Sequence, residues 1–290
     1  MTPTTYSFSF ADAWAKTTDG QVSVHLFTHC RIAGAVARVL ALRDQYSWTS
    51  GLPILCASHD VGKMSAPFLS QCPSWMSDHG LAQLIDRWRL SKIRHEVFSQ
   101  ATISDILDER GQSLMGARIV GAHHGRWQTS DPGEIDLFEV REFFKAERRA
   151  LVDLLESEFG RLPEEAFSQS QARYLAGAVA IADWIASNGE FFPYHDDYPP
   201  EACGLLAAKA VTQIGLIPQP FVPRMTFEQC FGFEPNPLQK AIGELPLDKG
   251  LYLLEADTGS GKTESTLVAQ VCSTPRGPNL SAYAGFFWPG

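Results

Sequence analysis

The pattern of apolar positions along the first two hundred residues predicts a mainly α-helical fold. From His29 to Leu42, the apolar residues Ile32, Val36, Val39 and Leu40 recur close to every 3.6 residues, which is the period of an amphipathic helix. Similar patterns predict helices at Leu52–His59, Leu81–Leu90, Glu96–Asp108, Ser113–His123, Glu139–Glu158 and Gln171–Ser187. No strand pattern stands out in this region, so we expect residues 1 to about 200 to be all-helical.

Prolines then mark the end of this helical region. The run His195–Pro200 predicts a loop, because its two consecutive prolines should break any helix there. A proline-rich stretch predicts a linker at residues 218–230. We therefore divide the chain into a helical domain at 1–217, the linker, and a separate segment at 231–290.

The last segment contains a phosphate-binding pattern. An apolar strand is predicted at Leu251–Glu255, and it runs into the glycine-rich stretch Ala256–Thr263. A strand, a glycine-rich loop and a helix start bind phosphate through backbone N–H groups, with Lys262 on the outer phosphates and Thr263 on Mg²⁺. The expected nucleotide-binding residues here are Gly259, Gly261, Lys262 and Thr263.

Composition places the chain among cytoplasmic globular proteins. Of its 290 residues, 44% are hydrophobic and 20% are charged, which is enough to bury a sizeable core. No apolar run is long enough to span a membrane, and Met1–Phe10 lacks the features of a secretory signal. Six scattered cysteines without a C-x-x-C pair indicate reduced thiols rather than disulfides or structural zinc.

The net charge of −9 argues against a protein that grips duplex DNA electrostatically. Such proteins neutralise phosphates with a basic surface and release counterions. If DNA is the substrate, bound metals must supply the local positive charge, or another surface must deliver the strand.

Histidines and aspartates recur in a pattern that predicts a metal site. The pair His59-Asp60 follows an apolar helix, and further imidazoles and a carboxylate lie upstream and downstream. An aspartate flanked by histidines can bridge two divalent metals, and this ligand mixture suits Mn, Fe, Co, Ni or Zn better than Mg or Ca. Two metals about 3.5–4 Å apart clamp the attacking and leaving oxygens of a phosphodiester. The candidate ligands are His29, His59, Asp60, His95, His123, His124 and Asp183.

Each candidate also has a simpler interpretation. The pair His123-His124 could be a solvated helix end, and His95 a surface residue. Asp183 is harder to dismiss, because it continues the apolar face of its predicted helix, and a buried carboxylate without a partner is costly. A metal or another cation is therefore expected beside it. Taken together, the residues favour a metal-dependent phosphohydrolase or nuclease.

Four further basic or imidazole side chains have more open roles. His25 lies four residues before His29, so it would share the same helix face as a ligand or as a group behind the ligands. Lys63 could hold a scissile phosphate, or it could pair with a carboxylate. His79 and His195 are expected to be surface residues.

These motifs, in this order, resemble the HD nuclease domain of the Cas3 family, the nuclease-helicase of type I CRISPR interference. The motifs are His29-Cys30, His59-Asp60-Val61-Gly62-Lys63, Arg94-His95-Glu96, Ala122-His123-His124-Gly125 and Ala182-Asp183-Trp184. Phe231–Thr263 resembles the start of the family's superfamily 2 helicase, with Gln239 matching its adenine-reading glutamine. The resemblance implies an HD-domain helical bundle with a two-metal site, followed by a truncated α/β RecA-like start.

The resemblance also implies roles for the candidate residues. His29, His59, Asp60 and Asp183 would hold one metal, and His95, His123 and His124 the other, with Asp60 bridging. Asp60 and Lys63 would serve catalysis. The implied reaction is endo- or exonucleolytic cleavage of single-stranded DNA in antiviral defence, using two ions of Mn, Fe, Co or Ni rather than Mg. In the full-length family, ATP-driven translocation delivers the strand after recruitment by the Cascade surveillance complex.

The C-terminal segment departs from the family pattern. The chain ends 27 residues after Thr263, before the later helicase motifs and the second lobe, so we expect a truncated or frameshifted end without ATPase or helicase activity. Two alternatives to the nuclease stay open. One is a catalytically incomplete binding module that docks on the Cascade complex. The other is an HD-type nucleotide phosphohydrolase, which the neighbouring phosphate-binding loop disfavours.

Overall fold

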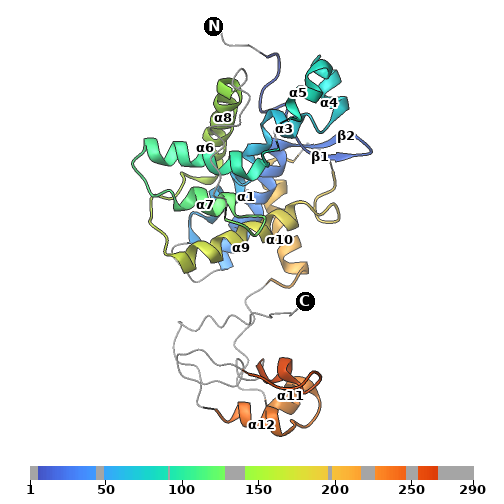
Figure 1. Cartoon of the computed structure of the whole chain (residues 1–290), viewed down its shortest axis with the longest axis vertical. Helices are drawn as coiled ribbons and strands as arrows, with labels where there is room; N and C mark the ends of the chain where they lie inside the picture. Colours follow the sequence, from blue (N-terminus) through green and yellow to red (C-terminus); the bar gives the residue numbers. More distant parts are fainter. Residues whose placement is uncertain are drawn as a thin grey trace. The chain divides into compact units, whose positions relative to one another are not determined.

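The computed structural model describes residues 6–43, 49–90, 92–127, 141–194, 198–216, 226–245 and 254–266 (Figure 1). The chain forms two compact units, Met1–Pro218 and Gln219–Gly290. The first unit is mainly helical, which confirms the predicted fold class. None of the described helices combines the length and the apolar character that crossing a membrane would require.

The first unit contains one β-hairpin followed by a series of helices. In chain order its elements are β1 (Trp14–Thr18), β2 (Gln21–His25), α1 (Leu26–Arg43), α2 (Leu52–Ala57), η2 (Val61–Lys63), α3 (Ala66–Leu69), α4 (Pro73–Asp78), η3 (Ala82–Leu84), α5 (Ile85–Trp88), α6 (His95–Glu109), α7 (Met115–Gly121), α8 (Arg141–Phe159), α9 (Gln169–Ala186) and α10 (Pro200–Gln213). Most of the predicted helices are present with shifted ends. The predicted helix at Leu81–Leu90 consists instead of two short pieces, η3 and α5.

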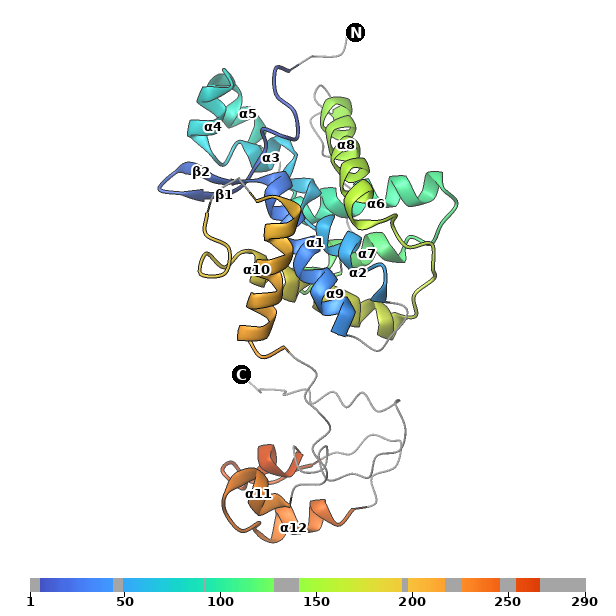
Figure 2. The same cartoon turned by 180° about the vertical axis from the view of Figure 1, so that it is seen from behind.

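Helix α1 lies at the centre of this unit. It packs against α2, α9 and α10, while α6 packs against α7 and η2 (Figures 1 and 2). The predicted apolar face of α1 is buried at Ile32 and Val36. This packing brings together residues that are far apart in sequence, because α1, α2, α7 and α9 all present residues to the same interior.

The β-hairpin contradicts the expectation that residues 1–200 would be all-helical. Strands β1 and β2 pair in antiparallel register, with Trp14 opposite His25 and Thr18 opposite Gln21. Asp19 and Gly20 form the turn with positive φ angles of 51° and 77°, and two such residues match the twist of a hairpin. The strands are short and irregularly paired, so they lack the extended alternation that predicts a strand, whereas the Asp-Gly turn is a signal that sequence reasoning overlooked.

Helix α10 corrects a second expectation, that the prolines after His195 would exclude a helix. Pro199 is the N-terminal cap, and Pro200 is the first residue of the helix. Proline is tolerated there because the first N–H groups of a helix have no partner within it, and its fixed φ already suits the helix. The predicted loop residues 195–197 lie outside the described part of the chain.

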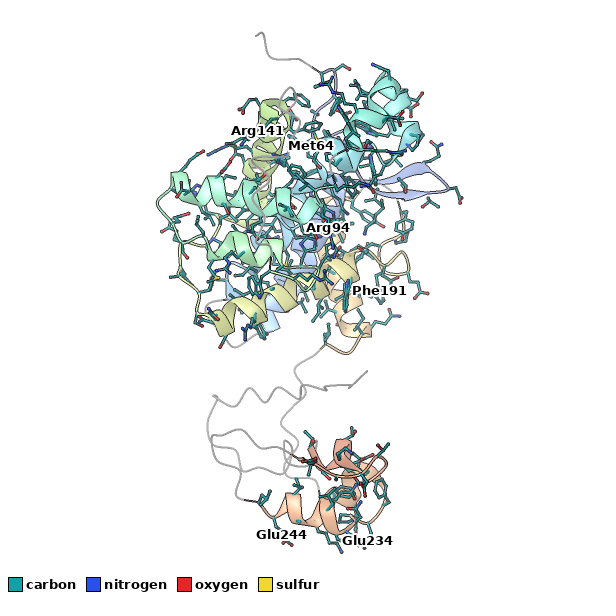
Figure 3. The ribbon with its side chains drawn as sticks, viewed as in Figure 1. Met64, Arg94, Arg141, Phe191, Glu234 and Glu244 are labelled. Atoms are coloured by element: carbon teal, nitrogen blue, oxygen red, sulfur yellow. The ribbon has the colours of Figure 1, made fainter. Side chains whose placement is uncertain are left out.

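A buried arginine joins three parts of the first unit. Arg148 of α8 donates from Nε to the Thr102 hydroxyl at 2.8 Å and from Nη1 to the Met64 carbonyl at 3.1 Å. Its guanidinium also lies 5.3 Å from the centre of the Phe98 ring. Figure 3 shows the side chains between the helices, including Met64, which is fully buried. These contacts hold the segment just after η2 against α6 and α8.

The second unit contains α11 (Phe227–Phe231), α12 (Pro237–Gly243) and a short helix at 262–266. Thr226 and Asn236 cap α11 and α12 through reciprocal hydrogen bonds with the glutamines three residues later. Three predicted or terminal segments lie wholly or partly outside the described part of the chain. They are most of the predicted linker, the first three residues of the strand expected at Leu251–Glu255, and residues 267–290. The predicted RecA-like sheet is therefore not tested.

Candidate metal centre

Asp60 lies in a buried turn between α2 and η2. His59 follows the end of α2, and Asp60 caps η2. Gly62 allows this turn to touch the start of α6, because a Cβ atom there would lie 1.9 Å from the His95 carbonyl oxygen and 2.5 Å from the Ser99 backbone nitrogen. The Gly62 N–H donates to the Ser99 hydroxyl at 2.8 Å. The close approach brings Asp60 within reach of His95.

His59 and His123 share one local arrangement. Each follows the end of a helix, and its Nδ1 lies near the carbonyl of the residue three positions earlier, Cys56 at 2.6 Å and Val120 at 2.7 Å. Because a carbonyl can only accept, Nδ1 carries the proton and Nε2 faces the interior. Both Nε2 atoms are buried, and neither has a hydrogen-bond partner among the described residues. Histidine ligands of metals are commonly oriented in this way.

The two oxygens of Asp60 face different imidazoles. Oδ2 lies 3.1 Å from Nε2 of His29 and 2.6 Å from Nζ of Lys63. Oδ1 lies 3.1 Å from Nε2 of His95 and 3.7 Å from Nε2 of His123. One carboxylate therefore stands between two groups of histidines.

Asp183 enters the centre from α9. Its Oδ1 lies 3.1 Å from Nε2 of His29 and 3.4 Å from Nε2 of His59, and it accepts a hydrogen bond from the Ser187 hydroxyl at 3.0 Å. A carboxylate on this largely buried helix face was expected to have cationic or metal partners, and the structure places two imidazoles beside it. Ser187 lies one helical turn later, so α9 itself orients the carboxylate.

The potential metal ligands form two groups, and within each group the donor atoms all lie within 4.8 Å of one another. One group is His29, His59, Asp60 and Asp183, and the other is His95, His123 and His124. The first group is almost fully buried, whereas His124 of the second is exposed and lies 3.2 Å from His95 between their Nε2 atoms. The buried Nε2 atoms of His59 and His123, which have no hydrogen-bond partner among the described residues, fit ligands of divalent transition metals.

Burial and neighbouring charges shift the pKa values of three residues in the centre. Burial lowers the pKa of His59, but the charge of Asp60 and contacts with both carboxylates outweigh this and raise the pKa to about 10. Burial raises the pKa of Asp60, but His59, Lys63 and His29 outweigh it and hold the pKa well below its usual range. Burial, assisted by the His59 charge, lowers the pKa of His123 to about 3. His59 is thus held protonated and Asp60 ionised, while His123 stays neutral.

Two lysines lie close to the carboxylates. Lys63 is buried, and its Nζ donates to Asp60 at 2.6 Å and to the Ala15 carbonyl at 3.3 Å. Of its two predicted uses, pairing with a carboxylate is the one that the structure contains. Sequence reasoning missed Lys16 of β1, whose pKa is lowered by burial and then by the charge of Lys63. The signal for Lys16 depended on the hairpin, which was not predicted although its Asp-Gly turn is visible in the sequence.

The remaining histidines lie outside both ligand groups. His25 is the last residue of β2, and α1 begins after it, so the expectation that it shares a helix face with His29 is wrong. A strand ends between the two positions, which breaks the helical spacing. His79 stacks on Trp75 at 4.1 Å and is only partly exposed. His195 lies outside the described residues.

The expected phosphate-binding loop of the second unit adopts a tight turn. Gly259 and Gly261 have φ angles of 81° and 79°, which side chains disfavour. Lys262 turns back over the loop, and its Nζ donates to the carbonyls of Ala256 at 2.6 Å and Asp257 at 2.8 Å. Thr263 is exposed in the short helix that follows.

Gln239 is tied to this same loop. Its Oε1 accepts from the Asn236 backbone N–H at 2.9 Å, and its Nε2 lies 3.4 Å from the Gly261 carbonyl oxygen. The Asn236 amide also donates to the Ser260 carbonyl at 3.0 Å. Gln239 is buried, and its contact with the Gly261 carbonyl connects α12 to the loop.

A comparison with protein families decides the affiliation of the chain. The family described as "Cas3, HD domain" matches residues 14–192, which is more than half of the chain and includes every candidate metal ligand. The chain belongs to this family. The resemblance of the HD motifs to the Cas3 family is therefore confirmed.

Individual relatives agree with this family. The chain is 28% identical over 291 residues to the CRISPR-associated endonuclease/helicase Cas3 of Thermus thermophilus, covering 88% of this chain and 32% of the relative. Its fold resembles T. fusca Cas3 solved with ATP, with a TM-score of 0.57, 22% identity and coverage of 90% and 34%. It also resembles a chain of a CRISPR RNA-guided surveillance complex in a pre-nicking state, with a TM-score of 0.53, 20% identity and coverage of 91% and 35%. The chain spans about a third of the length of each of these three chains.

Proposed function

We propose that this chain is a metal-dependent nuclease that hydrolyses phosphodiester bonds of single-stranded DNA. The observation that carries the proposal is the position of Asp60, whose two oxygens face two separate groups of imidazoles. A carboxylate in this position suits a pair of metal ions better than one. The proposal also rests on membership of the Cas3 HD-domain family.

Two divalent transition metals fit these residues. His29, His59, Asp60 and Asp183 would hold one, and His95, His123 and His124 the other, with Asp60 shared between them. When bound, such metals activate water and stabilise the charge that develops on a phosphodiester. The imidazole-rich ligand set favours Mn, Fe, Co or Ni over Mg.

The protein's own residues would position the substrate and keep the ligands rigid. The backbone carbonyls of Cys56 and Val120 fix the tautomers of His59 and His123, so these rings present only Nε2. Lys63 keeps Asp60 ionised and restrains its rotation. His124 is exposed and His95 is partly exposed, so the substrate would approach from this side of the centre.

Substrate and partner follow from the family and from the charge of the chain. An acidic protein has no general attraction for DNA of either form, so the choice of a delivered single strand rests on the resemblance to the Cas3 family. The similar chain in a CRISPR RNA-guided surveillance complex supports the proposal that this chain acts beside such a complex.

We propose that the second unit binds the phosphates of ATP through its glycine-rich loop, with Lys262 released from the Ala256 and Asp257 carbonyls.

A metal and substrate panel tests the nuclease. Protein stripped of metal is incubated with Mn²⁺, Co²⁺, Ni²⁺ or Mg²⁺ and with circular single-stranded DNA, linear single strands or blunt duplex. We expect cleavage of single strands with the transition metals, less with Mg²⁺ and none in chelator, and conversion of circles reports endonuclease activity. Full activity in chelator, or equal cleavage of duplex and single strands, would contradict the proposal. Hydrolysis only of free nucleotides would favour the phosphohydrolase alternative.

A further inference from the structure

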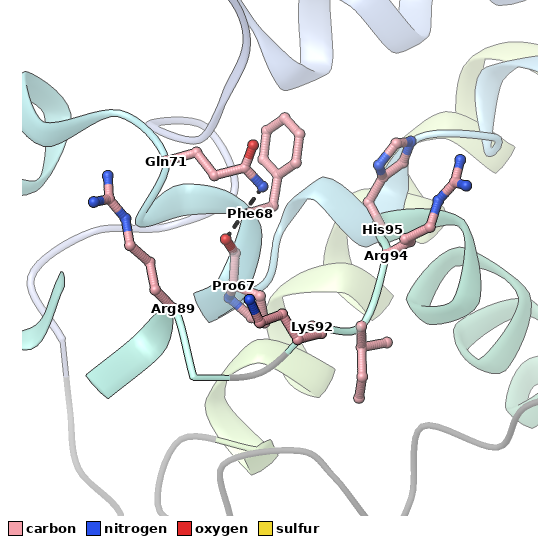
Figure 4. Close-up of a pocket in the computed structure, with 8 residues that line it drawn as sticks. Pro67, Phe68, Gln71, Arg89, Lys92, Arg94 and His95 are labelled. Carbon is pink, nitrogen blue, oxygen red and sulfur yellow. Dashed lines mark hydrogen bonds between the residues drawn. The ribbon is translucent and has the colours of Figure 1, made fainter. Parts of the chain in front are cut away.

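A basic groove opens beside the candidate metal centre. It is bounded by α3 on one side and by the segment leading into α6 on the other, and its volume is about 690 Å³. Figure 4 shows Arg89 at one end and Arg94 with His95 at the other, with Pro67 and Phe68 between them. The volume falls within the range of ligand-binding clefts.

The charge of the groove differs from that of the chain as a whole. Its described lining includes the cations Arg89, Lys92 and Arg94 and no carboxylate, although the net charge of the chain is −9. All three side chains are exposed. Arg89 is oriented by a hydrogen bond from Nε to the Ser70 carbonyl at 3.1 Å, and Arg94 is paired with the buried Glu96 just outside the lining. The groove therefore presents positive charge in a chain whose net charge is negative.

His95 belongs both to the groove and to the candidate metal centre. It lines the groove, and its Nε2 lies 3.1 Å from Oδ1 of Asp60. Phe68 forms part of the wall, with its ring 5.6 Å from the His95 ring and 5.3 Å from Nζ of Lys63 between centroid and nitrogen. A polymer lying in the groove would therefore reach the same imidazole that faces the bridging carboxylate.

We infer that this groove binds the single-stranded DNA segment that flanks the scissile phosphate. Arg89, Lys92 and Arg94 contact successive backbone phosphates, and Pro67 and Phe68 provide an apolar surface beneath the sugars and bases. Single-strand binding sites commonly combine a basic track with apolar or aromatic side chains in this way. The inference rests on the proposed nuclease function and adds the path by which an acidic protein holds its substrate.

The test removes two cationic side chains of the groove, Arg89 and Lys92, which are not among the candidate metal ligands. The double variant Arg89→Ala/Lys92→Ala is compared with Arg161→Ala/Arg173→Ala, which removes two exposed arginines from other elements of the same unit. Binding of a fluorescein-labelled 20-nucleotide oligo(dT) is measured by anisotropy in chelator, where cleavage does not interfere. Cleavage of the same strand and of bis(p-nitrophenyl) phosphate is measured with Mn²⁺, because this small diester is too short to span the groove while its phosphate lies at the metal centre.

We expect the groove variant to bind oligo(dT) about tenfold more weakly at 0.1 M salt. The slope of the logarithm of its binding constant against the logarithm of the salt concentration should be shallower by roughly 1.4, which is about 0.7 for each of two lost phosphate contacts. The KM for the strand should rise while hydrolysis of the small diester stays unchanged. The Arg161/Arg173 variant should change the strand affinity less than twofold. The single variant Lys92→Glu, at an exposed position, should weaken oligo(dT) binding as well. It replaces the double variant in the binding measurement if the double variant fails to fold.

The outcomes separate this inference from the proposed nuclease. Equal binding by the groove variant and the wild-type protein, with an unchanged salt slope, overturns the groove. Equal losses in the two double variants overturn it as well, because they indicate a general charge effect. If neither substrate is cleaved by any protein, the nuclease proposal fails, whereas the binding measurement still decides the groove.

Discussion

The imidazole rings of His59 and His123 stand at 90° to one another, with their centroids 5.0 Å apart. Each ring is fixed through Nδ1 by a backbone carbonyl, and each directs a buried Nε2 into the same interior. They nevertheless belong to different ligand groups, so the two positions can be altered separately.

We predict that His123→Gln and His59→Gln each reduce the bound metal from about two ions per chain to about one, because each substitution removes one ligand from a single group. Metal content after reconstitution with Mn²⁺ and desalting, measured by inductively coupled plasma mass spectrometry, provides the count. His79→Gln is the matched control, since His79 lies outside both groups. Retention of two ions by both ligand variants would contradict the assignment.

Metal binding should release a proton at pH 8. The pKa of His59 is raised to about 10 in the metal-free protein, so its ring is protonated at a pH where an ordinary histidine is neutral. A metal needs the neutral ring, and we expect about one proton to leave from this residue. Affinity should accordingly rise with pH until the pH passes about 10.

Calorimetric titration in buffers of different ionisation enthalpy measures this proton release. The wild-type protein should show a clear dependence of the binding enthalpy on the buffer, and His59→Gln should release about one proton fewer. Identical proton release from the two proteins would show that His59 is already neutral before the metal binds.

Gly62→Ala should destabilise the first unit by about 3 kcal/mol, at the upper end of the usual cost of overpacking. The added Cβ would lie 1.9 Å from the His95 carbonyl oxygen, so the turn must move away from α6. Gly177→Ala in α9 is the matched control, because a Cβ there meets no atom within 4 Å, and alanine should stabilise this helix by about 0.5–1 kcal/mol. Urea unfolding of both variants measures the difference. Equal stabilities would mean that the close approach of Gly62 is not required.

Much of the helical fold followed from the sequence, and the remainder depended on tertiary context. The apolar period of α1 is a local signal of this kind. The hairpin was missed because its strands are short, and α10 was missed because two prolines were taken as a break rather than as a helix start. The short strands are held by pairing with each other, and the two prolines stand where a helix begins, so neither local pattern alone indicates the element that forms.

The candidate ligands could be selected from sequence because imidazole and carboxylate have few other uses in apolar helices. Their division into two groups came only with the resemblance, and the division of the Asp60 oxygens required coordinates. The basic groove was not predicted, since Arg89 and Lys92 become significant only when α3 lies opposite them. Lys16 was missed for the same reason.

Lys262→Ala should weaken binding of a fluorescent ATP analogue by at least about tenfold, since the lysine contacts the outer phosphates in loops of this kind. Lys240→Ala on α12 provides a control that removes one positive charge from the same unit. Equilibrium fluorescence titration with Mg²⁺ gives both affinities. Equal affinities for the two variants would contradict nucleotide binding by the loop at 256–263.

The central claim is that one carboxylate, Asp60, serves both metal ions, and Asp60→Asn tests it most directly. The substitution keeps the shape of the side chain and removes its charge, and circular dichroism with the His79→Gln control verifies the fold. We predict loss of both metals and a fall of more than about 100-fold in Mn²⁺-dependent cleavage of circular single-stranded DNA, beyond the 10–100-fold typical of a group that only orients a ligand. Near wild-type cleavage with two ions still bound would contradict the account.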